Sequence, residues 1–158
     1  MSLRSAIARV GGALALTIAA CAPSDTTHGT GIRVSRLYYV LPAGTSPGAI
    51  YFVMTNATAA PDTLTAIESS AGAMVMIHSP MPAMEAITAI ALAPGATERL
   101  APGVRHAMVS APFPTIKEGD SVRVTLTFAR AGPLALRAAA ITYADVDTAT
   151  ALRADNRE

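Results

Sequence analysis

The sequence of 158 residues has few of the residue types on which many folds and functional sites depend. It contains one cysteine, Cys21, and no tryptophan, and aromatic residues make up only 4% of the chain. Without a cysteine after position 21, the rest of the chain has no internal disulfide and no thiolate ligand. This excludes a blue-copper electron-transfer site and the usual cysteine-rich structural zinc site. The core must therefore be built from aliphatic residues and methionine.

Charge is also sparse, at 15% of residues with a formal net charge of +1, whereas hydrophobic residues make up 51%. This balance favours a packed core over disorder and gives no basic field for nucleic acid. Beyond residue 20 no apolar run is long enough to span a bilayer. We also expect no enzyme, because Glu85 and Glu98 are isolated acids and Ser79 merely follows His78 along a strand.

The N-terminus has the pattern of an export signal. Arg4 and Arg9 precede or begin an apolar stretch over residues 10–20 that is too short to span a bilayer. The stretch ends in IAAC at residues 18–21, which resembles a bacterial lipobox and implies cleavage before Cys21 and lipidation of that residue. The alternative is an ordinary secretory signal with a free Cys21. We expect a lipid-anchored protein on the periplasmic side of a bacterial membrane, and Ala22 after the cysteine favours the outer membrane.

Short apolar segments alternate with Pro- and Gly-containing turns after residue 31, without helical periodicity. This pattern predicts an all-β sandwich or barrel of about nine short strands. We expect a signal peptide over 1–20, a lipidated cysteine and flexible tether over 21–31 that includes His28, a β domain over 32–143 and a polar tail over 144–158. The expected strands cover residues 32–40, 49–56, 63–69, 73–79, 86–92, 97–100, 105–111, 121–129 and 134–141.

Two histidines and two methionines of the β domain form a candidate metal-binding set: His78, Met84, His106 and Met108. In a strand, residues i and i+2 point to the same face, so His106 and Met108 project side by side. Thioether and imidazole together suit Cu(I) and suit hard cations poorly. Taken singly, each residue could be ordinary packing, since methionine is a common core filler. The combination is harder to explain in that way.

The spacing of this set resembles the PCuAC copper chaperones of the bacterial periplasm. The pattern is a His that closes a strand, followed by M-x21-H-x-M, and the flanking segments agree with it. These segments are AIYFVMTN at 49–56, DTL at 62–64, LAPGATERLAPGVR at 92–105, KEGD at 117–120 and VTLTF at 124–128. The resemblance covers about residues 32–142 and implies a cupredoxin-like or immunoglobulin-like β-sandwich.

The resemblance also implies roles for individual residues. The two His ligands of the family fall on His78 and His106, and its two Met ligands fall on Met84 and Met108. Only five residues separate His78 from Met84, fewer than the family's usual interval of about ten, which makes Met81 a candidate extra or substitute ligand. Met74 and Met76 share a strand face with His78. We expect them to be core or flanking residues, the alternative being a methionine-rich surround of the site.

The resemblance implies a membrane-anchored carrier protein whose bound ion is Cu(I). The expected acceptor is cytochrome c oxidase, at its copper A site, or an intermediary copper chaperone, and the carrier itself is expected to be a monomer. Two alternatives stay open at this point. One is a copper-buffering or tolerance lipoprotein that lacks a dedicated acceptor, and the other is a structural or adhesive β-sandwich lipoprotein that binds no metal.

Overall fold

A computed structural model of the protein describes residues 26–27, 31–112 and 116–146, so the expected lipidation site Cys21 and the linker residue His28 lie outside the described residues. The described chain is almost entirely β-structure, which confirms the predicted fold class. The elements are β1 (Thr26–Thr27), β2 (Ile32–Val40), β3 (Gly48–Asn56), β4 (Asp62–Ser69), β5 (Gly72–His78), β6 (Ala86–Ile87), β7 (Ile90–Leu92), β8 (Thr97–Leu100), β9 (His106–Pro112), β10 (Ser121–Phe128), β11 (Gly132–Ile141) and the 3-10 turn η1 (Tyr143–Asp145).

Alternation along the strands explains why the chain folds in this way. In β10, Val122, Val124, Leu126 and Phe128 are buried, while Ser121 and Arg123 are exposed. A period of two places all the apolar side chains of such a strand on one face, which must be covered by another layer. The neighbouring β11 follows the same pattern, and its residues Gly132 to Ala139 pair with β10.

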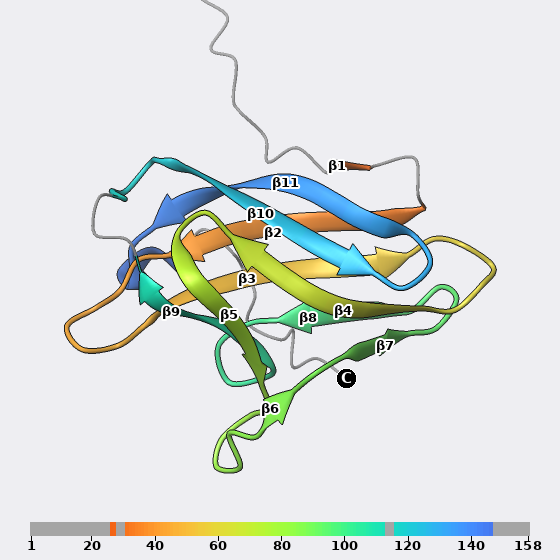
Figure 1. Ribbon diagram of the computed structural model, residues 1–158, viewed down its shortest axis with the longest axis horizontal. Helices are drawn as coiled ribbons and strands as arrows, with labels where there is room; N and C mark the ends of the chain where they lie inside the picture. Colours follow the sequence, from red (N-terminus) through yellow and green to blue (C-terminus); the bar gives the residue numbers. More distant parts are fainter. Residues whose placement is uncertain (1–25, 28–30, 113–115, 147–158) are drawn as a thin grey trace, which may run out of the picture.

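The strands form one sheet that folds over on itself, in the order β6-β5-β9-β3-β2-β11-β10-β4-β7 (Figure 1). All the pairings are antiparallel except that of β11 with β2. β3 has two successive partners on one side, because Gly48–Ile50 pairs with β9 and Phe52–Thr55 pairs with β8. β3 therefore joins the half of the sheet that contains β5 and β9 to the rest of the fold.

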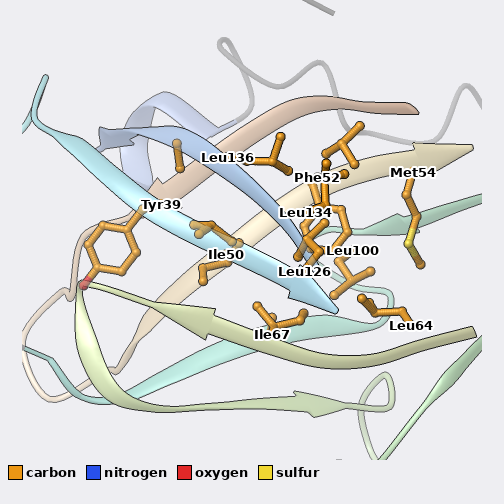
Figure 2. Close-up of a cluster of buried hydrophobic side chains, with 14 of the residues drawn as sticks. Tyr39, Ile50, Phe52, Met54, Leu64, Ile67, Leu100, Leu126, Leu134 and Leu136 are labelled. Atoms are coloured by element: carbon orange, nitrogen blue, oxygen red, sulfur yellow. The ribbon is translucent and has the colours of Figure 1, made fainter. Parts of the chain in front are cut away.

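The core lies between the strands of the folded sheet (Figure 2). Tyr39 lies at one end of the cluster shown there, and Met54 and Leu64 lie at the other. Gly48 packs so closely on Tyr39 that a Cβ atom built on the glycine would meet the Tyr39 hydroxyl at 2.7 Å. A second, smaller cluster on the outer face of β2 and β3 contains Val40, Tyr51, Ala101 and Val146.

The structure differs from the expected strands, tether and tail in one place each. The segment 86–92 is divided into β6, which pairs with β5, and β7, which pairs with β4, because the chain changes partner between Ile87 and Ile90. Thr26–Thr27, inside the expected tether, forms a short pairing with β2. Val146, inside the expected polar tail, is buried. Within the described ranges no helix is long and apolar enough to cross a membrane.

Candidate metal centre

Two histidines face each other across the β5–β9 ladder. His78 pairs directly with His106, and Met76 pairs directly with Met108. Directly paired residues lie on the same face of a sheet. The two imidazole rings have centroids 5.9 Å apart and are tilted by 35°. The intervening Ile77 and Ala107 are buried in the main core, so the histidines and Met108 stand on the outer face.

A hydrogen bond fixes the orientation of the His106 ring. Its Nδ1 lies 3.0 Å from the carbonyl oxygen of Val104. Since a carbonyl oxygen only accepts, Nδ1 carries the proton and donates it in this contact. The neutral ring then has its lone pair on Nε2, the atom left to bind a metal ion.

His78 presents a different situation. Its Nδ1 is buried and has no hydrogen-bond partner within the described part of the chain. A buried polar atom without a partner is costly, and most such atoms in proteins are satisfied. This nitrogen is therefore left to bind a group that the described residues do not supply.

The β5–β6 loop positions the first thioether. Ser79 closes the loop twice: its N–H donates to the Glu85 carbonyl at 2.8 Å, and its Oγ accepts from the Glu85 N–H at 2.9 Å. Met84 is half-buried and has a φ of +48°, in the left-handed region that few residues other than glycine adopt. Backbone strain of this kind persists where surrounding contacts enforce it, often at functional sites.

An open groove of about 640 Å³ gathers most of the predicted set. Met81, Met84, His106 and Met108 all line it, although they come from a loop and a strand far apart in sequence. His78 does not line the groove and instead stands beside His106 at its edge. The rest of the lining comes from the end of β2, the β2–β3 connection, β3 and η1: Val40, Leu41, Ala43, Ser46, Pro47, Gly48, Ala49, Tyr51 and Tyr143.

Most of these wall residues could not be found from the sequence. Leu41, Pro47 and Tyr143 carry no metal-ligating group, and only the fold brings them to the methionines. Burial raises the pKa of the Tyr51 hydroxyl, and the nearby Tyr143 adds to the effect, so Tyr51 remains a neutral wall residue. The only available signal was the Pro- and Gly-rich turn at residues 41–48, which indicated a connection but not its position.

The donors in the groove are soft and uncharged. Within the described residues, no three His, Cys, Asp or Glu side chains cluster in a way that could hold a metal ion. Arg105, the residue before His106, forms an ion pair with Glu98 at 3.1 Å. Thioether sulfur and imidazole nitrogen therefore define the chemistry, which favours soft or borderline ions over Mg²⁺ or Ca²⁺.

This combination of rolled β-sheet and outward His–Met strand defines a β-sandwich of the PCuAC type. Similar solved structures include the copper-bound PCuAC domain from PmoF2 (24% identity, TM-score 0.66), which covers 75% of this chain and 98% of that domain. The apo PCuAC domain from PmoF1 has 22% identity and a TM-score of 0.67, with 75% and 99% covered. Cu(I)-DR1885 from Deinococcus radiodurans has 19% identity and a TM-score of 0.58, with 66% and 74% covered.

At these identities the likeness shows the fold. The chain belongs to the LpqE-like lipoprotein family, whose model matches residues 32–140. No curated protein sequence matches it. The predicted resemblance to PCuAC proteins is thus confirmed for the fold.

Proposed function

We propose that the protein is a Cu(I)-binding metallochaperone that holds its cargo with Met84, His106 and Met108. His78 completes the set from the groove edge, and Met81 is an additional ligand from the loop. The observation that carries this proposal is the convergence of three thioethers and one imidazole from distant segments on one groove. Copper-bound forms of similarly folded PCuAC proteins support it.

The geometry suits a carrier better than a permanent store. Neutral thioethers and imidazole bind Cu(I) without adding charge, and these donors match its softness. Met81 is 72% exposed, so an acceptor protein can reach the loop from solvent. Transfer then needs only the exchange of one ligand at a time, in which donor and acceptor briefly share the ion. No proton transfer and no enzymatic step is required.

In the cell, the proposed carrier is anchored by lipid at Cys21 on the periplasmic side of a bacterial membrane, with the outer membrane favoured, and acts as a monomer. The proposed acceptor is the copper A site of cytochrome c oxidase or an intermediary chaperone. The same site would serve a copper-buffering lipoprotein that has no dedicated acceptor. Loss of oxidase activity in a deletion strain at low copper, restored by added copper, distinguishes delivery from buffering.

Competition with a chromophoric Cu(I) chelator tests the site. The wild-type protein is expected to take up Cu(I), and Met84→Ala/Met108→Ala is expected to weaken binding at least about tenfold, because two ligands are lost. Met54→Leu is the matched control, because Met54 is fully buried in the main core. If the double variant binds as tightly as wild type, the assignment is wrong. Absence of Cu(I) uptake by wild type favours a structural lipoprotein.

A further inference from the structure

A second group of methionines lies in solvent beside the groove. In the described part of the chain, the exposed large hydrophobic side chains are Met74 (56%), Met76 (37%), Met81 (72%) and Tyr143 (62%). Met81 and Tyr143 line the groove, but Met74 and Met76 do not. These two were expected to be core or flanking residues, and their exposure shows that they lie outside the core.

The backbone register brings both side chains to the outer face of β5. Met74 pairs with Ser110 and Met76 pairs with Met108, whereas Ile77 on the opposite face is buried in the core. Residues i and i+2 of a strand are about 7 Å apart on one face. Directly paired residues have Cβ atoms about 5 Å apart. Met74, Met76 and Met108 therefore form a continuous row of thioethers that ends in the groove.

The row has the chemistry of a soft-metal site. Each thioether sulfur lies two bonds beyond Cβ on a flexible side chain, so the sulfurs of Met74 and Met76 can converge on one ion. Thioethers favour Cu(I) and ions like it over Mg²⁺ or Ca²⁺. The hydroxyl of Ser110, opposite Met74, is a hard donor, so the row of soft donors ends there on β9.

We propose that Met74 and Met76 form a second, exposed binding site for Cu(I), separate from the groove site. Met108 lies beside Met76 and belongs to the proposed groove site, so it connects the two. An ion captured by the pair passes to the groove by exchange of one thioether for another and remains Cu(I) throughout. Binding of Cu(I) by Met74 and Met76 does not depend on the proposed function of the groove. Transfer of the ion to the groove rests on that function.

Leucine substitution separates this role from hydrophobic docking. Met→Leu keeps volume and apolarity and removes only the sulfur. A surface that merely contacts a partner protein keeps its properties in Met74→Leu/Met76→Leu, whereas a metal site is lost. Both side chains are exposed, so the variant is expected to fold like wild type, which urea denaturation checks.

The experiment is a titration of the protein, labelled with 13C at the methionine methyl groups, with Ag(I) as a redox-inert substitute for Cu(I). The Met84 and Met108 signals are expected to shift with the first equivalent, and the Met74 and Met76 signals with the second. Met54, fully buried in the core, is an internal reference whose signal stays in place. Met74→Leu/Met76→Leu is expected to lose the second step and keep the first.

The proposal is overturned if the Met74 and Met76 signals stay unmoved through the titration, or if the leucine variant still takes up the second equivalent. A further variant, Met84→Leu/His106→Ala, separates this result from the fate of the groove site. If only the groove proposal fails, the Met74 and Met76 signals still shift in wild type. The titration of Met84→Leu/His106→Ala is then the same as that of wild type. If only the second site fails, wild type shows the first binding step alone. That step is then absent in Met84→Leu/His106→Ala.

Discussion

At the scale of single residues, the alternation of side chains along β9 decides which of them reach the groove. His106 and Met108 point outward, while Ala107 and Val109 are buried in the core between and beyond them. The period of two in strands made this arrangement predictable from the sequence. The proton position on His106 was not predictable, because it depends on the Val104 carbonyl, which the preceding turn brings within 3.0 Å of Nδ1.

Met84 provides a prediction at this scale, because its backbone has a φ of +48°. In an ordinary element, alanine is more stable than glycine by about 0.5–1 kcal/mol. At Met84 the order is expected to reverse, since alanine retains a left-handed strain of about 1–2 kcal/mol that glycine lacks and that exceeds this advantage. Urea denaturation of Met84→Gly and Met84→Ala measures the difference. Equal stability, or a more stable alanine variant, would contradict the strained backbone.

At the scale of elements, the β5–β6 hairpin holds the loop thioethers against β9. The ladder between β5 and β6 contains only two residue pairs, Ile77 with Ile87 and His78 with Ala86. Ser79 extends it with two hydrogen bonds to Glu85, one through each backbone group of Glu85. The position of Met84 therefore depends on a short ladder and one serine side chain.

Ser79→Ala tests this dependence. The variant is expected to lose about 1 kcal/mol of unfolding free energy, as for an ordinary exposed hydrogen bond. It is also expected to weaken Cu(I) binding by up to about tenfold, because the loop that carries Met84 is less constrained. Thr65→Ala is the matched control, since its hydroxyl donates to the Thr127 carbonyl at 3.0 Å outside the groove lining. Equal Cu(I) affinity of the two variants would show that Ser79 does not position the ligand.

The strands were largely predictable from the sequence, and the groove was not. The clear alternation of Val122 to Phe128 gave β10 to within one residue of its C-terminal end. The division of segment 86–92 into β6 and β7 depends on a change of strand partner, which no local pattern encodes. For the same reason Tyr143, which follows Met81 by 62 residues, could not be placed in the same groove before the fold was known.

At the scale of the whole molecule, a buried carboxylate ties two distant turns together. Asp62, at the start of β4, accepts hydrogen bonds from the N–H groups of Thr63, Arg130 and Ala131. The last two belong to the turn between β10 and β11. Burial by itself raises the pKa of Asp62, but these three N–H donors and the Arg130 charge outweigh it, and the net pKa is lowered.

This shift gives stability a defined pH dependence. Because the folded-state pKa of Asp62 lies below its unfolded value, near 3.8, its stabilisation is fully present above about pH 4 and is lost as the pH falls through the folded-state value. Asp62→Asn is expected to lower the unfolding free energy by about 2 kcal/mol at pH 7. Urea denaturation from pH 7 to pH 3 should show the variant's deficit shrinking at the acidic end. A deficit that stays constant with pH would contradict the role of ionised Asp62.

The pairing of β3 with two successive strands also affects which part of the sheet opens first. β3 is bordered by β2 on one side and by β9 and then β8 on the other, so its amide groups are shielded from solvent exchange at both edges. β6 is held only by two residue pairs and the adjacent hydrogen bonds between Ser79 and Glu85, so we expect its hairpin to open more readily than β3. The groove spans this boundary, because Met108 lies on a strand paired with β3, whereas Met81 and Met84 lie in the loop between β5 and β6. We therefore expect the proposed release of Cu(I) to proceed through local opening of this one hairpin, without any disturbance of the core.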